Sequence, residues 1–220
     1  MKVQAVIFDL DGVLTDTAEG HYLSWQRVCD EEGIPFTRQM NEQLRGRRRA
    51  DSLRLILGER QVDEATFNAI LARKNAYYLE YLETLTPEAL LPGIPQLLDA
   101  LDAAGIPYAV GSASRNARRV LAQLGVLERF AFVGDGNTVA RAKPAPDLFL
   151  AIAQALDVSP AASVVVEDAQ AGVEAALRGG FGVVGVGPAE RVGAAHVVVP
   201  DTAALSLDCL QEALKRRQFA

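Results

Sequence analysis

The spacing of hydrophobic and polar positions follows one pattern early in the chain and another after residue 92. A run of β-branched and apolar residues at 3–8 predicts a strand, which breaks at Gly12. Apolar residues then recur at helical spacing, and no convincing strand follows until residues 107–111. Because roughly a hundred residues far exceed a normal crossover connection, we expect a helical domain inserted after the first strand. Its predicted helices cover residues 16–33, 37–44, 50–57 and 63–82, the first opening on a capping-box pattern at 16–19.

Beyond residue 92, helices and strands alternate regularly. Helices are predicted at 94–103, 115–124, 146–156 and 170–178, and strands at 107–111, 131–133, 163–166, 182–186 and 196–199, before a C-terminal helix. Such alternation is typical of a parallel sheet with helices on both faces. The sequence therefore predicts an α/β fold, in which a doubly wound, Rossmann-like parallel sheet carries an inserted helical bundle.

Polar side chains follow three of the predicted strands where each strand ends. They are Asp9 and Asp11, Ser112 and Ser114, and Glu167 with Asp168. In open parallel sheets, ligands bind outside the carboxyl ends of the strands, so we expect these side chains to share one site.

The first pair of acids indicates the chemistry of that site. Asp9 and Asp11 are two residues apart, so in extended backbone their side chains point to the same side and their charges repel. A cation relieves this repulsion, and Mg²⁺ suits it because it binds a few carboxylate oxygens and also accepts a phosphate oxygen. The alternative is that both are ordinary turn acids at a strand end.

Composition and charge narrow the range of partners. The net charge of −6 argues against a nucleic-acid partner, which would call for a basic face. Cys29 and Cys209 are too few for a disulfide framework, and both stand in helix-like apolar patterns, which favours packing roles in a reducing compartment. With no signal peptide and no apolar run long enough to span a bilayer, we expect a cytoplasmic protein without membrane contact, and by default a monomer.

Together, these residues resemble the haloacid dehalogenase superfamily, and more closely its β-phosphoglucomutase branch, over the whole chain. The superfamily motifs are Asp9-Leu10-Asp11-Gly12-Val13, then Ser112, Lys143-Pro144 and Glu167-Asp168. The branch is indicated by Thr17-Ala18-Glu19, His21, Trp25, Asn41-Glu42-Gln43-Leu44-Arg45-Gly46, Arg49-Ala50-Asp51-Ser52, Arg73-Lys74-Asn75 and Ser112-Ala113-Ser114-Arg115-Asn116. The resemblance implies a core domain at 1–15 and 88–220 and a cap domain at 16–87. Two linkers, near 14–16 and 84–92, would let the cap swing over the site.

The resemblance also assigns roles to the strand-end residues. Asp9 would be the nucleophile that forms an aspartyl phosphate, and Asp11 the general acid and base for the sugar oxygen. Mg²⁺ would bind Asp9, the backbone carbonyl of Asp11, and Asp168, with Glu167 and water completing or supporting the shell. Lys143 would add a positive charge and Ser112 a hydroxyl donor, although Lys143 alone could be an exposed loop lysine and Ser112 a helix cap.

A mutase that turns a bisphosphate around needs a second phosphate site. Arg49, Ser114 and Asn116 resemble the residues that form it in the family, with Ala113 and Arg115 in the same turn. Arg47 and Arg48 depart from the small or apolar residues expected there. Either they flank the site or they face solvent, and we expect solvent.

The remaining substrate contacts are expected from the cap. His21 and Trp25 lie one helical turn apart, which would place His21 near Asp11 and Trp25 against the substrate, although simple packing is the alternative. The other residues assigned to the sugar-facing surface are Thr17, Leu44, Arg45, Gly46, Ser52 and Lys74.

The resemblance implies interconversion of β-D-glucose 1-phosphate and D-glucose 6-phosphate, with glucose 1,6-bisphosphate as intermediate and activator. A Mg²⁺-dependent sugar-phosphate phosphatase would use the same acids and is the first alternative. A catalytically silent sugar-phosphate-binding protein is the second, although the presence of all the core acids argues against it. A dehalogenase would have no use for Asp11, and a phosphonatase would need a cap lysine that forms a Schiff base.

Overall fold

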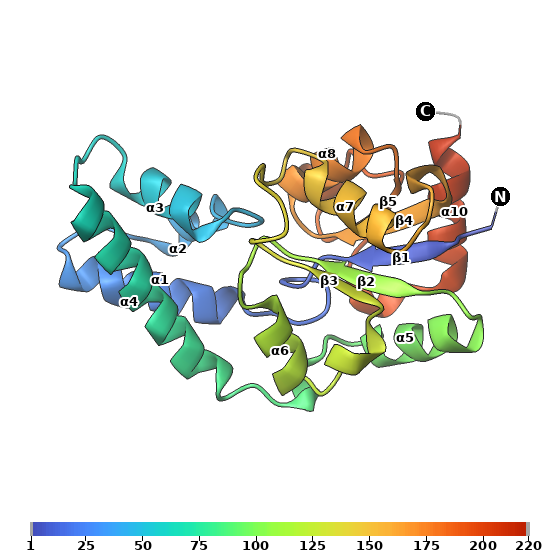
Figure 1. Cartoon of the computed structure of the whole chain (residues 1–220), viewed down its shortest axis with the longest axis horizontal. Helices are drawn as coiled ribbons and strands as arrows, with labels where there is room; N and C mark the ends of the chain where they lie inside the picture. Colours follow the sequence, from blue (N-terminus) through green and yellow to red (C-terminus); the bar gives the residue numbers. More distant parts are fainter. Residues whose placement is uncertain (1, 219–220) are drawn as a thin grey trace.

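The computed structural model describes residues 2–218, and its central feature is a six-stranded parallel sheet (Figure 1). The strand order is β3-β2-β1-β4-β5-β6, which confirms the predicted doubly wound topology. The strands are β1 (Ala5–Phe8), β2 (Tyr108–Gly111), β3 (Phe132–Gly134), β4 (Ser163–Glu167), β5 (Gly182–Val186) and β6 (Val197–Val199). β1 pairs with both β2 and β4, so the carboxyl ends of these three strands lie at one edge.

Helices cover both faces of the sheet because successive strand residues point to opposite sides. Val6 and Phe8 belong to one buried cluster, which includes side chains of α5 (Ile94–Ala103), α6 (Ala117–Gln123) and α10 (Leu207–Arg217). Ile7 belongs to a second cluster with α7 (Asp147–Ala155), α8 (Gln170–Arg178) and α9 (Ala189–Val192). Figure 1 shows α5 and α7 on opposite sides of the strands. The alternation of side chains along the strands therefore creates two apolar cores, one on each face of the sheet.

The residues between β1 and α5 contribute a third buried cluster. Their helices are α1 (Ala18–Glu31), α2 (Arg38–Glu42), α3 (Arg49–Leu57) and α4 (Glu64–Leu82), which we call the helical segment. Trp25, Leu53 and Ile70, from three of these helices, are members of the cluster. Figure 1 shows the helical segment beside the sheet rather than against either face of it. The predicted domain boundaries at 15/16 and 87/88 stay a prediction.

The start of α1 differs from the predicted capping box, for a reason connected with the site. The helix begins at Ala18, and the N-cap residue Thr17 makes no side-chain bond to the helix. Its hydroxyl donates to the Asp11 carboxylate instead. Asp16 provides the local bond, because its Oδ1 accepts from the Ala18 amide at 3.0 Å. In the described part of the chain, no helix is long and apolar enough to cross a membrane.

Candidate active site

Three buried carboxylates meet where β1 and β4 end. One oxygen each from Asp9, Glu167 and Asp168 lies within 4.8 Å of the others. Burial and the charges of Glu167 and Asp9 raise the pKa of Asp168 well above its ordinary value. Gly12 makes this approach possible: at φ +89°, a side-chain Cβ there would stand 2.4 Å from an Asp168 oxygen. Such a concentration of negative charge fits a divalent cation with oxygen ligands. The Asp11 side chain is outside this cluster, and its predicted metal contact, through the backbone carbonyl, stays a prediction.

The Lys143 ammonium neutralises part of this charge. Its ammonium donates to Asp9 Oδ1 at 2.6 Å, to Glu167 Oε1 at 2.7 Å and to the Gly111 carbonyl at 2.9 Å. Burial alone would lower the pKa of Lys143, but Asp9 and Glu167 outweigh it and raise that pKa above its ordinary value. The alternative of an exposed loop lysine is therefore wrong, since Lys143 is buried.

Glu167 is bonded through both carboxylate oxygens. Oε1 accepts from Lys143, and Oε2 accepts from the Ala169 amide at 2.7 Å. This arrangement fits the version of its predicted role in which Glu167 supports the shell, and it also lets Glu167 orient Lys143. Asp168 also accepts from outside the sheet, because Arg45 Nη1 of the helical segment lies 3.1 Å from its Oδ2.

Asp11 has different surroundings from Asp9, although only Leu10 separates them. One of its oxygens accepts from Thr17, and the other lies 3.9 Å from His21 Nε2. Burial, and next the charge of Asp9, raise the pKa of Asp11 from 3.8 to about 6. A carboxyl group with this pKa can hold or release a proton near neutral pH, as a general acid and base must.

Lys74 of α4, which is buried, and His21 of α1, which is half-buried, form a pair next to Asp11. Lys74 Nζ lies 2.7 Å from His21 Nδ1, and the His21 ring stacks on Tyr78 with centroids 4.1 Å apart. Burial, and next the charge of Arg49, lower the pKa of Lys74 from 10.5 to about 7. Burial and then Lys74 also lower the pKa of His21 well below 6.5, so the imidazole is neutral. When Lys74 donates to Nδ1, the imidazole proton is on Nε2 and points toward Asp11.

A cavity of about 500 Å³ separates these strand ends from the helical segment. Its core-side lining consists of Asp9, Asp11, Ala113, Ser114, Arg115, Asn116 and Asp168. The helical segment contributes Ala18, His21, Trp25, Asn41, Leu44, Arg45, Gly46, Arg47, Arg48, Arg49, Ala50, Ser52, Asn68, Leu71, Ala72, Lys74, Asn75 and Tyr78. This volume is within the range of pockets that enclose small molecules.

Positive charge is concentrated on another part of the lining. Arg49 donates to the Leu71 carbonyl at 3.1 Å, and its pKa is lowered by burial and by the neighbouring charge of Arg115. Asn116 Nδ2 donates to Asn75 Oδ1 at 2.9 Å, which joins the turn after β2 to α4. Two guanidinium groups that repel each other across a cavity favour an anion between them.

The structure brings most of the predicted site residues to this cavity. Four do not line it: Thr17, Ser112, Lys143 and Glu167. Thr17, Lys143 and Glu167 contact lining acids or each other, whereas Ser112 Oγ accepts from the Ser114 amide at 3.0 Å, a bond that shapes the turn. The individual roles assigned to these residues stay predictions.

Gly46 and Arg48 approach the core, in addition to lining the cavity. At φ +69°, Gly46 lets the backbone approach Ala169 of the core, where an added Cβ would stand 3.2 Å away. Arg48, expected to face solvent, donates to the carbonyls of Val139 and Ala140, so that expectation was wrong for Arg48. The expectation holds better for Arg47, which is exposed and donates to the Gln43 carbonyl at 2.9 Å, although it also lines the cavity.

Sequence reasoning assigned no site role to Tyr78 or Asn75, two lining residues of α4 that make specific contacts, although it quoted Asn75 in a family motif. Tyr78 stands one helical turn after Lys74, so helical spacing from the lysine could have identified it. Asn75 pairs with Asn116, from a segment far along the chain, and helical spacing carries no signal for that contact.

Comparisons with known proteins agree with this geometry. The model of the haloacid dehalogenase-like hydrolase family matches residues 3–180. A β-phosphoglucomutase of Bacillus subtilis is 44% identical over 214 residues, which cover 96% of this chain and 95% of that one. The crystal structure of a β-phosphoglucomutase from Clostridium difficile has a TM-score of 0.94 at 35% identity, covering 99% of this chain and all of the other. A phosphorylated carbohydrates phosphatase of Thermotoga maritima is 28% identical, over 81% of this chain and 82% of its own.

Proposed function

The chain belongs to the haloacid dehalogenase-like hydrolase family, and from this premise we propose that it is a β-phosphoglucomutase. It interconverts β-D-glucose 1-phosphate and D-glucose 6-phosphate through an aspartyl phosphate and glucose 1,6-bisphosphate. The observation that carries the proposal is that two neighbouring acids have different surroundings. Asp9 lies in the carboxylate cluster against Lys143, whereas Asp11 lies outside that cluster with a pKa of about 6.

The first half of the cycle transfers a phosphoryl group from Asp9 to the sugar. Asp11, as carboxylate, takes the proton of the 6-hydroxyl of β-glucose 1-phosphate while that oxygen attacks the phosphorus on Asp9. The bond between phosphorus and the Asp9 oxygen breaks, which leaves Asp9 as a carboxylate and glucose 1,6-bisphosphate in the cavity.

The second half runs the same chemistry in reverse after the bisphosphate has turned around. Asp9 attacks the phosphorus on C1, and Asp11 returns its proton to the departing C1 oxygen. Glucose 6-phosphate leaves, and the aspartyl phosphate is regenerated. While one phosphate reacts, Arg49, Ser114 and Asn116 hold the other, a role supported by the positive charge on that side of the cavity.

The residues at the strand ends fit a magnesium ion. Asp9 and Asp168 would hold it, together with the Asp11 backbone carbonyl, while Glu167 supports the shell and orients Lys143. A bound Mg²⁺ neutralises the carboxylates and the charge on the phosphoryl group. Lys143 contributes a fixed positive charge beside the Asp9 oxygen throughout the cycle.

A sugar-phosphate phosphatase is the second candidate, because one relative is named as a phosphatase and the Asp11 side chain is 28% exposed. The two functions differ in the group that attacks the aspartyl phosphate. Water produces free phosphate, whereas a sugar hydroxyl produces the bisphosphate. The proposal includes movement of residues 16–87 as a cap that excludes water.

The test supplies β-glucose 1-phosphate, Mg²⁺ and a catalytic amount of glucose 1,6-bisphosphate, and follows glucose 6-phosphate and free phosphate separately. Isomer formed well ahead of phosphate supports the mutase. Rapid phosphate release with little isomer would replace the proposal with a phosphatase. The proposal also places the enzyme in the cytoplasm as a monomer, acting on free sugar phosphates.

A further inference from the structure

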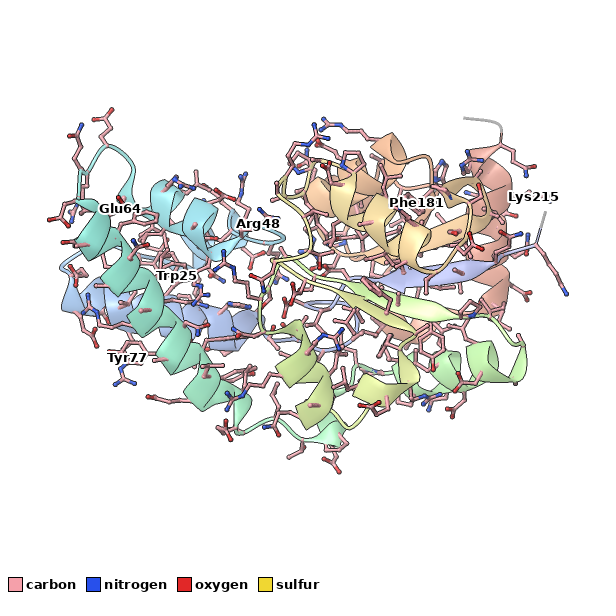
Figure 2. The ribbon with its side chains drawn as sticks, in the orientation of Figure 1. Trp25, Arg48, Glu64, Tyr77, Phe181 and Lys215 are labelled. Carbon is pink, nitrogen blue, oxygen red and sulfur yellow. The ribbon has the colours of Figure 1, made fainter. Side chains whose placement is uncertain are left out.

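Arg48 reaches from the helical segment to the core. It stands just before α3, at the N-cap position, where its backbone is extended. Its guanidinium donates to the carbonyls of two consecutive core residues, to Ala140 through Nη1 at 2.5 Å and to Val139 through Nη2. Figure 2 shows Arg48 on the side of the helical segment that faces the core. A guanidinium has the geometry to bind two neighbouring acceptors at once.

The carbonyls that Arg48 binds belong to the connection between β3 and α7, residues 135–146. This connection carries Lys143, whose ammonium contacts Asp9 and Glu167. Ala140 itself is exposed, so without Arg48 its carbonyl would be bonded to water. The contact therefore joins the helical segment to the backbone that presents Lys143.

Further contacts cross between the helical segment and the core, and two of them use groups that line the cavity. Arg45 binds Asp168 at the end of β4, and Asn75 binds Asn116 after β2. Arg48 instead binds backbone that takes no part in the chemistry, on the β3 side. These three contacts therefore lie beyond the ends of three different strands around the cavity. Contacts at three separate points can fix the orientation of the helical segment relative to the core.

We propose that Arg48 is a positioning residue that clasps the helical segment to residues 139–140 and so keeps water from the reacting acids during phosphoryl transfer. The inference rests on the proposed function, because exclusion of water matters most when a sugar hydroxyl must outcompete it. Two hydrogen bonds from a charged donor stabilise the closed arrangement relative to one in which the donor and both carbonyls are hydrated. Loss of the clasp increases the time during which water reaches the aspartyl phosphate.

The first test compares wild type with Arg48→Ala, Arg48→Lys and the control Arg60→Ala. Arg60 is a suitable control because it is an exposed arginine that donates to a backbone carbonyl, Gly33 at 3.2 Å, within the helical segment. In the two-product assay, we expect Arg48→Ala to raise the ratio of free phosphate to glucose 6-phosphate roughly tenfold. The lysine of Arg48→Lys lacks the planar fork that binds both carbonyls, so its product ratio should lie between those of Arg48→Ala and wild type. Arg60→Ala should have the wild-type ratio.

The second test measures closure directly, by hydrogen exchange of peptides covering residues 135–146 in the protein without substrate. Arg48→Ala should exchange faster there than wild type and Arg60→Ala. Unchanged exchange together with an unchanged product ratio overturns the clasp, and faster exchange with an unchanged ratio overturns its role in excluding water. If wild type releases phosphate and forms no isomer, the proposed function fails, while the exchange comparison still decides whether Arg48 holds the two parts together.

Discussion

Asp9 and Asp11 show how one intervening residue can give two identical side chains different chemistry. Asp9 is paired with the Lys143 ammonium at 2.6 Å, which places a positive charge beside its carboxylate oxygen. Asp11 is paired with the Thr17 hydroxyl and a neutral imidazole, so no full positive charge touches it. Its raised pKa follows from burial and from Asp9 itself. In the proposed mechanism, the charge of the nucleophile Asp9 therefore helps to set the pKa of the general acid and base, Asp11.

Replacing Asp9, the proposed nucleophile, should remove activity and leave the fold intact. We expect Asp9→Asn to lower turnover by at least about a thousandfold, because an amide cannot form the acyl phosphate. Isomer formation measures the loss, and the unfolding temperature checks the fold. Turnover close to that of wild type in a folded variant would overturn the assignment of Asp9.

Asp11→Asn should slow transfer to and from sugar, while Asp9 can still be phosphorylated by a donor with a good leaving group. The same variant tests the raised pKa through stability. Between pH 4 and 6, folded Asp11 keeps its proton while the unfolded chain loses it, so wild type loses stability as the pH rises. The shift from 3.8 to about 6 corresponds to at most about 3 kcal/mol.

The asparagine variant carries no such charge, so we expect it to be more stable than wild type at pH 8 and equal to it at pH 4. Urea unfolding of both proteins at the two pH values, without metal, measures the difference. A stability difference that does not change with pH would mean that the pKa of Asp11 is not raised.

At the scale of elements, the sequence predicts what depends on local spacing and misses what depends on distant partners. The period of apolar residues identifies the strands and the helices of the helical segment, because burial on one face is a local pattern. It cannot show that the Thr17 hydroxyl leaves its helix for Asp11, since the competing acceptor is a strand-end side chain. The Arg48 contact with residues 139–140 was unpredictable for the same reason, as it joins segments about ninety residues apart.

The contact between α1 and α4 supports a further prediction. Lys74 is buried against His21 and has a pKa of about 7. Near and below neutral pH, its buried charge raises the free energy of the folded state but not that of the unfolded chain, which lowers stability. As the pH rises from 7 to 10.5, the folded protein releases this proton before the unfolded chain does, and wild type gains stability. We expect Lys74→Met to be more stable than wild type at pH 6.5, with the difference disappearing near pH 10.5.

Denaturant unfolding of both proteins across this range measures the effect of Lys74. Substrate affinity should move the other way, falling roughly tenfold at neutral pH because the cavity loses a cation. A methionine variant that is less stable than wild type at pH 6.5 would show that Lys74 is held by favourable contacts that outweigh its burial.

For the whole molecule, the sheet topology decides where the charge gathers. Asp9 directly follows β1 and Glu167 ends β4, and the order of strands makes β1 and β4 neighbours although most of the chain separates them. The alternation of helices and strands predicts that side chains at the carboxyl ends of neighbouring strands lie close together. It does not predict which carboxylate oxygens approach one another. Folding therefore brings three carboxylates together, and their mutual repulsion makes the cluster suited to a cation.

This repulsion predicts how the whole molecule responds to metal. Mg²⁺ that binds only the folded cluster should raise the unfolding temperature of wild type by about 5–10 °C at a hundredfold excess over its Kd. Asp168→Asn removes one carboxylate, so without metal it should unfold at a higher temperature than wild type, and it should lose most of the rise with Mg²⁺. Asp201→Asn, an exposed acid outside the cluster, should respond to Mg²⁺ as wild type does. Calorimetry with and without Mg²⁺ measures all three proteins, and an equal rise in Asp168→Asn would place the metal elsewhere.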